Sequence, residues 1–322
     1  MKEITFLKEN SEKWQKFERL IVTTNKTNPD VLADLFIQLT DDLSYARTNY
    51  PKSNTVKYLN GLAAKVHQEI YKNKKEKAGR IALFWKYELP MTFQKSHRSL
   101  LYSFLIFFIS VLLGILSAAY DDDFVRLILG DSYVNMTLDN IDKGDPMAVY
   151  KQMNQVDMFI GITVNNIIVS FYTFAMGLFF SLGTAYMLFN NGIMLGSFQY
   201  FFYQKGLLLQ SVLAIWVHGT LEISAIIIAG CAGLVMGNSI LFPGTYSRGV
   251  SFIMGAKQGL KIIIGLIPIF IMAAFFEGFI TRYTEMPHYL STLIILTSLT
   301  FIIWYFIIYP LQLNKHNNDG KN

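Results

Sequence analysis

The chain has 322 residues, of which 52% are hydrophobic and only 16% are charged, and its formal net charge is +5. Soluble domains usually carry about 25% charged residues, so this composition argues against a purely soluble protein. Cys231 is the single cysteine, which excludes a disulfide framework within one chain. We expect no cleavable signal peptide, because the start MKEITFLKENSEKW is charged and has no apolar stretch.

Residues 1–97 are predicted to form a cytoplasmic helical region. Apolar residues recur there at helical spacing, as with Trp14 and Phe17. Pro29 is expected at the first turn of a second helix, and Ser53 is expected to cap a third. A small helical domain is the plain interpretation of these stripes, and a platform that docks a partner is compatible with it.

A basic and aromatic segment comes directly before the most apolar part of the chain. Residues 72–98 hold eight Lys or Arg and two Glu, with four aromatic residues among them. This composition is typical of an amphipathic helix at the cytoplasmic surface of a membrane, where anionic lipid attracts basic residues. Nucleic-acid binding uses similar residues, but the adjacent apolar segment argues against it.

The clearest predicted span covers residues 99–120, since a transmembrane helix needs roughly 20 apolar residues. The following loop, residues 121–157, holds eight acidic and three basic residues. Because Lys and Arg accumulate on the cytoplasmic side of a span, the amino terminus is predicted inside and this loop outside. The loop contains FVRLILG, which fits a short surface helix.

The rest of the chain predicts further spans. Residues 158–204 lack Asp, Glu, Lys and Arg, and the Asn- and Gly-rich part at 190–192 suggests a tight turn or a re-entrant segment. The other expected segments are an apolar stretch at 207–241 interrupted by His218-Gly219, a cytoplasmic loop at 243–261, spans at 262–283 and 289–311, and a polar tail at 313–322. We therefore expect an all-α polytopic bundle over 98–312, with six spans, or four if 186–230 is re-entrant.

Ionisable residues inside spans are rare, and they indicate functional sites. His218 and Glu222 lie four residues apart, so a helix would place both on one face. The predicted intramembrane polar site adds an acid from a later span and three amides; its full set is His218, Glu222, Asn165, Asn166, Asn191 and Glu277. Arg282 is expected to extend toward the membrane surface.

Four interpretations of the His218 and Glu222 pair stay open. It is a hydrogen-bonded latch between spans, a proton or ion pathway, a metal site, or part of an intramembrane hydrolase. Zinc would need a third protein ligand, such as Glu277, and the H-E-x-x-H motif is absent from the sequence. No cofactor is implied, because Walker A, G-x-S-x-G, C-x-x-C and dinucleotide patterns are also absent.

Five motifs together give this chain a resemblance to a known family. They are N-N-I at 165–167, N-N-G-I-M-L-G at 190–196, H-G-T-L-E-I-S-A at 218–225, L-F-P-G at 241–244 and A-A-F-F-E-G-F at 273–279. In this order they resemble the stage II sporulation protein M family, over about residues 99–311.

The resemblance implies a polytopic protein of the bacterial inner membrane without an established enzyme activity. The namesake branch works in a membrane complex with a peptidoglycan hydrolase during engulfment. This chain departs from that branch by its long helical start, so only membrane location and a link to envelope remodelling are carried over. We expect a scaffold or complex subunit with the lipid bilayer and envelope proteins as partners, with homo-oligomers open; the alternative is a transporter or channel.

Overall fold

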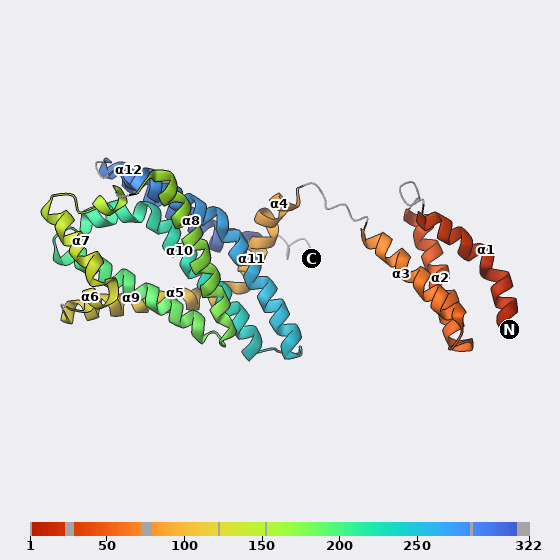
Figure 1. The fold of residues 1–322 in the computed structure, drawn as a ribbon. Coiled ribbons are helices and arrows are strands. Elements are labelled where there is room, and N and C mark those ends of the chain that lie inside the picture. The colour runs from red at the N-terminus through yellow and green to blue at the C-terminus, as the bar shows by residue number, and fades with distance from the viewer. Residues whose placement is uncertain are drawn as a thin grey trace. The chain divides into compact units, whose positions relative to one another are not determined.

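The computed structural model describes residues 2–22, 29–72, 79–121, 123–151, 153–283 and 286–313, and all regular elements within these ranges are helices. The predicted all-α class is therefore confirmed. The chain divides into two compact units, Met1–Arg80 and Ile81–Asn322 (Figure 1). The expected region of residues 1–97 therefore contains the whole first unit and the start of the second. Residues 314–322 of the expected tail lie outside the described ranges.

The first unit contains three helices, α1 (Glu3–Val22), α2 (Pro29–Asn49) and α3 (Asn54–Lys72). Pro29 opens α2, as predicted, because a helix does not need the missing N–H in its first turn. The Ser53 hydroxyl accepts a hydrogen bond of 3.0 Å from the Thr55 N–H, so the predicted cap of α3 is confirmed.

This unit has an apolar core of its own. The core is made of buried residues from all three helices: Phe6, Trp14, Phe17, Leu39, Leu43, Ala46, Leu59, Leu62 and Val66. Trp14 also donates a hydrogen bond of 2.8 Å from its indole nitrogen to the Asp42 carboxylate, which satisfies the polar atom of this buried ring. A separate core is the physical basis of an independently folding unit.

The second unit consists of long apolar helices together with several shorter elements. Its elements are α4 (Arg80–Leu83), η2 (Phe84–Glu88), α5 (Leu89–Tyr120), α6 (Phe124–Leu129), α7 (Asp131–Asp142), η3 (Ala148–Lys151), α8 (Gln155–Ala175), η4 (Met176–Leu178), α9 (Leu182–Gln204), α10 (Leu208–Leu241), α11 (Arg248–Phe275), η5 (Phe276–Thr281), α12 (His288–Ile303) and η6 (Trp304–Ile308). Here α4, η2 and α5 run on as one helix.

Five of these helices are long and apolar enough to cross a membrane: Arg80–Tyr120, Gln155–Leu178, Leu208–Leu241, Arg248–Thr281 and His288–Leu313. The protein is therefore a multi-pass membrane protein by its helix composition. The sixth span expected from the sequence corresponds to α9, which has 23 residues and no charged side chain but a more polar composition than the other five.

The expected turn at residues 190–192 is wrong, because α9 runs through it without a break. The glycines of α9 allow close helix packing instead. A Cβ on Gly196 would overlap the Val111 carbonyl of α5, so the lack of a side chain lets α5 and α9 touch. The turn lies earlier, where Phe180 and Ser181 have φ angles of 53° and 67°.

Two further expectations about the membrane unit need correction. The segment 243–261 is helical from Arg248 onward, so Lys261 stands on α11 and its ammonium lies 2.8 Å from the Glu88 carboxylate. His218-Gly219 does not interrupt the chain, because α10 is continuous from Leu208 to Leu241. In an apolar surrounding an unbroken helix satisfies its backbone groups internally, which favours this outcome.

The central helix of the membrane unit is α10, which contacts α5, α8, α9, α11 and α12. The apolar core of the membrane unit includes Leu89 and Phe93, which come from the segment expected to lie at the membrane surface. The Phe93 ring packs against Phe306 of η6, with ring centroids 4.7 Å apart. The hydroxyl of Tyr305 donates a hydrogen bond of 2.6 Å to the Trp85 carbonyl, so the first and last spans are joined.

The loop between α5 and α8 folds onto one end of the membrane unit, called here the loop end. It contains α6, α7 and η3, and α6 covers the predicted FVRLILG helix. A separate apolar cluster attaches it to the ends of α5, α9 and α10; the cluster consists of Ala118, Val125, Val134, Met147, Phe201, Phe202 and Ile215. The loop is thus a packed cap over this end of the bundle.

Candidate functional site

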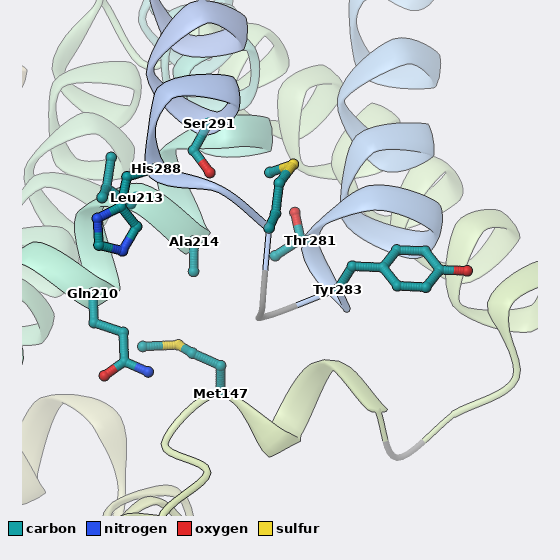
Figure 2. Close-up of a pocket in the computed structure, with 9 residues that line it drawn as sticks. Met147, Gln210, Leu213, Ala214, Thr281, Tyr283, His288 and Ser291 are labelled. Carbon is teal, nitrogen blue, oxygen red and sulfur yellow. The ribbon is translucent and has the colours of Figure 1, made fainter.

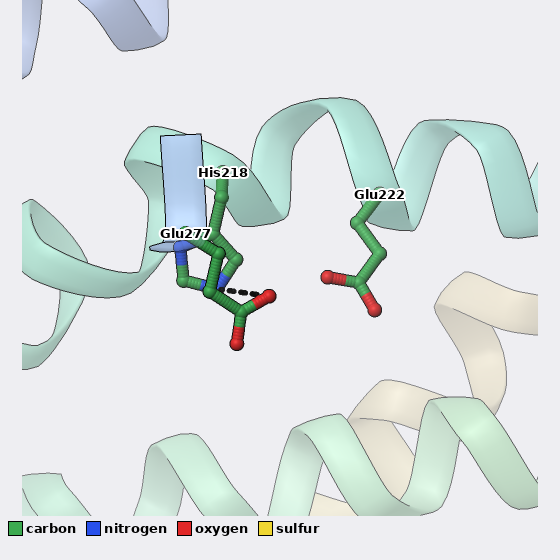
Figure 3. A group of neighbouring side chains, drawn as sticks. All are labelled: His218, Glu222 and Glu277. Atoms are coloured by element: carbon green, nitrogen blue, oxygen red, sulfur yellow. Dashed lines mark ion pairs between the residues drawn. The ribbon is translucent and has the colours of Figure 1, made fainter. Parts of the chain in front are cut away.

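A buried cluster of one imidazole and two carboxylates lies within the membrane unit, toward the loop end (Figure 3). His218 and Glu222 project from successive turns of α10, and Glu277 comes from η5. One potential ligand atom from each of the three residues lies within 4.8 Å of the other two. His218 Nε2 is 3.8 Å from Glu277 Oε2.

A hydrogen bond fixes the orientation of the imidazole. His218 is 4% exposed, and its Nδ1 lies 2.9 Å from the Thr281 hydroxyl oxygen. If Nδ1 carries the proton, it donates to Thr281 and leaves the Nε2 lone pair facing the carboxylates. If Nε2 carries the proton, Thr281 donates to Nδ1 and the ring N–H points toward Glu277. Thr281 therefore serves either tautomer.

The local backbone of η5 places both Glu277 and Thr281 on the side that faces α10. Residues Phe276–Thr281 form a π-helical turn at the end of α11, and such turns are frequent at functional sites. Gly278 lets the start of α8 approach, since a Cβ there would lie 3.2 Å from the Gln155 carbonyl oxygen. Gly278, between Glu277 and Thr281, thus allows α8 to pack closely against η5 at the site.

The amides predicted for the site fall in three different places. Asn166 of α8 is 7% exposed and lies beside Glu222, but its amide nitrogen completes no hydrogen bond among the described residues. Asn165 is exposed and donates to the Asn166 side chain at 3.4 Å. Asn191 donates at 2.8 Å to the Met187 carbonyl of its own helix. The structure therefore brings Asn166 to the cluster, and Asn165 only through its neighbour.

Tyr150 of η3 covers the cluster from the loop end. Its ring meets the His218 ring edge to face, with centroids 5.6 Å apart. Burial raises the pKa of the Tyr150 hydroxyl well above its usual value, and the nearby Glu277 raises this pKa further. The phenol is therefore neutral at physiological pH, and it can act as a hydrogen-bond donor.

Arg282 holds the loop in this position. Its guanidinium donates hydrogen bonds of 3.2 Å to the Met153 carbonyl and 3.4 Å to the Lys151 carbonyl. Arg282 thus anchors the end of η5 to the loop.

A small cavity of about 40 Å³ lies near the cluster at the loop end (Figure 2). Its polar lining groups include Gln210, His288, Ser291 and Thr281. This volume is sufficient for a water molecule with polar partners. Thr281 also bonds His218, so one side chain is shared by the cavity and the cluster.

The cluster concentrates hydrogen-bond acceptors. Two carboxylates lie close to one another beside an imidazole, and close like charges in an apolar interior repel strongly. A proton shared by the carboxylates, a protonated imidazole or a bound cation would each offset this repulsion. A latch, a proton relay and a metal site all fit this arrangement, and the third ligand that zinc would need is in place.

Sequence reasoning missed two residues of this site. Thr281 follows Glu277 by four residues, which is a helical spacing that could have identified it. Tyr150 lies on a loop 68 residues before His218 and belongs to no polar motif, so no sequence signal pointed to it.

Comparisons with known proteins agree with this architecture. A family model described as stage II sporulation protein M matches residues 103–282, and one described as a domain of unknown function (DUF8413) matches residues 4–72. No curated protein and no solved structure matches the chain. The first match spans more than half of the chain and contains His218, Glu222, Glu277 and Thr281. The chain therefore belongs to the stage II sporulation protein M family.

Proposed function

We propose that this protein is a scaffold or complex subunit of the bacterial cytoplasmic membrane that contributes to cell-envelope remodelling. The observation that carries the proposal is the first unit, which has its own apolar core and lies before the first candidate span. A folded unit attached to a membrane bundle is suited to hold a partner at the membrane. The link to the envelope comes from the family.

The proposed topology has the amino terminus inside. Basic residues precede α5 and acidic residues follow it, which favours an outside location of the loop end. Contacts support a sixth crossing by α9: Gly192 lies against Phe107, and Gly196 lies against Val111, so α5 and α9 run parallel. With six crossings both ends of the chain lie inside.

Purification after crosslinking in native membranes tests the scaffold. The full chain should yield a reproducible partner, and a variant lacking residues 1–72 should lose it while still inserting. Gly161→Ala in α8, outside this unit and with nothing within 4 Å of the added Cβ, is the control and should keep the partner. Absence of any reproducible partner of the full chain would contradict the proposal.

A transporter is the second candidate, and the small cavity favours it. Thr281 lines this cavity and also bonds the His218 ring, so a polar cavity and the polar cluster lie on either side of one residue. Transport sites are typically polar and lie inside the membrane. Flux of protons or cations into liposomes that contain the purified protein, abolished by Glu277→Gln, would favour this candidate over the scaffold.

A further inference from the structure

We propose that His218, Glu222 and Glu277 bind one divalent transition-metal ion, with Zn²⁺ as the reference ion, inside the membrane unit. This inference is independent of the scaffold proposal, because it concerns the interior of the bundle and not its partners. It begins with the convergence of three potential ligand atoms within 4.8 Å of one another.

Charge balance favours a divalent cation. With a neutral imidazole, the two ionised carboxylates contribute two negative charges, and a divalent cation leaves the cluster neutral. Uncompensated charge inside an apolar bundle is strongly unfavourable, and buried charges are stable mainly when paired or metal-bound. His218 is buried, and the side chains of Glu222 and Glu277 are mostly covered, so solvent supplies little compensation.

The ligand types select the class of metal. Imidazole favours zinc and its neighbours in the first transition series, and carboxylates are common partners in such mixed sites. A tetrahedral zinc site with bonds of 2.0–2.1 Å separates its ligand atoms by about 3.3 Å. The glutamate side chains have rotatable bonds enough to close the present spacing. Three protein ligands leave one position for water.

The outer partners match those of known metal sites. A metal-bound histidine usually donates its second ring N–H to a neighbouring acceptor. Here Nδ1 has the Thr281 hydroxyl at 2.9 Å, which leaves Nε2 directed at the carboxylates. With the proton on Nδ1 this bond is kept, and the Nε2 lone pair can bind a metal.

Asn166 is the independent observation that points to a missing ligand. Only 7% of this residue is exposed, and its amide group interacts with Glu222, yet the amide nitrogen makes no hydrogen bond of full geometry with a described residue. A buried donor without a partner is costly. A carboxylate drawn onto a metal, or a water bound to that metal, would accept from this amide and remove the cost.

The competing account is a proton shared between the carboxylates, which also removes the repulsion without a metal. Metal binding by the purified full-length protein distinguishes the two. The protein in detergent is stripped with a chelator, dialysed against Zn²⁺ and freed of excess ion, and its metal content is measured by mass spectrometry. We expect about one zinc per chain, and retention of none would overturn the proposal in favour of the shared proton.

Variants assign the ion to this cluster. His218→Ala and Glu277→Gln should each lower zinc affinity by at least about 100-fold, more than the roughly 10–100-fold that loss of an outer partner causes. The matched control is His67→Ala, which removes an exposed histidine of α3 in the first unit and should bind zinc like the wild type. Equal zinc binding by His218→Ala and the wild type would overturn the assignment.

X-ray absorption of the zinc-loaded wild type gives a test that needs no variant to fold. The expected spectrum has nitrogen and oxygen ligands at about 2.0–2.2 Å, with scattering from a single imidazole. A sulfur ligand at about 2.3 Å, or scattering from two or more imidazoles, would place the ion elsewhere and refute the site.

Discussion

The imidazole of His218 on α10 is joined to the hydroxyl of Thr281 at the end of η5 by a hydrogen bond of 2.9 Å, across 63 residues of sequence. The bond connects two neighbouring spans and sets the direction of the ring's second nitrogen. Both the stability of the bundle and the chemistry of the cluster therefore depend on one hydroxyl group.

Replacing Thr281 by valine tests this dependence. Thr281→Val keeps the shape but removes the hydroxyl, and we expect the protein to lose about 1 kcal/mol of stability, as for other hydrogen bonds between membrane helices. Thr281→Ser retains the hydroxyl and should lose much less. Thermal unfolding in detergent measures the difference, and equal melting temperatures of the two variants would contradict the role of the bond.

The contact between α5 and α9 should be sensitive to a single methyl group. Gly196→Ala places a Cβ against the Val111 carbonyl, so we expect a loss of about 1–3 kcal/mol from overpacking. Gly161→Ala in α8 is the control, because nothing lies within 4 Å of its added Cβ. Thermal stability should fall for the first variant only; a similar fall in both would indicate a general effect of alanine.

The first unit should fold as an isolated fragment. Residues 1–76 contain the complete apolar core of this unit, so circular dichroism should show substantial helix. Trp14→Ala removes a ring that is 2% exposed and should cost about 3–5 kcal/mol, enough to unfold a small domain. Ile4→Ala is the exposed control. A random-coil spectrum of the unmodified fragment would show that it needs the rest of the chain.

Cysteine labelling tests the proposed topology. In a Cys231→Ser background, Asp139→Cys on the exposed side of α7 should react with an impermeant reagent added outside intact spheroplasts. Tyr246→Cys, in the turn between α10 and α11, should react only after permeabilisation, and Tyr246 is 56% exposed. The reverse pattern would invert the orientation of the whole bundle.

Local sequence rules accounted for the helix starts and for part of the site. Pro29 and Ser53 act through their own backbone neighbourhoods, so their effect is visible in sequence. The i, i+4 spacing likewise places His218 and Glu222 on one face of α10. Such short-range signals depend on neighbouring residues only, so they do not require knowledge of the tertiary packing.

The misplaced turn shows where these rules fail. Asn-Asn-Gly at 190–192 is typical of turns in water, but within an apolar bundle the helix continues because each backbone group needs an internal partner. The observed turn contains Phe180 and Ser181 at positive φ, which neither residue type favours. Tertiary packing determined both outcomes, and a single sequence does not contain that packing explicitly.

The composition of the polar cluster depends on packing in the same way. Glu277 is 55 residues beyond Glu222, and Tyr150 comes from the preceding loop, so only the folded bundle brings them together. Polarity within an apolar run identified the candidates. Polarity alone did not show which amide would reach the cluster. Asn165 is exposed and Asn191 bonds its own helix, so neither of them belongs to it directly.

The bond between Tyr305 and the Trp85 carbonyl has a consequence for biosynthesis, because 220 residues separate its partners. The first span leaves the ribosome and enters the bilayer long before the last one exists. Until η6 arrives, Phe93 lacks the ring of Phe306 and faces lipid or an insertion factor. Chains truncated before residue 288 should therefore insert their early helices but lack the contacts that η6 makes with the start of the first span. Such chains should remain targets for membrane quality control.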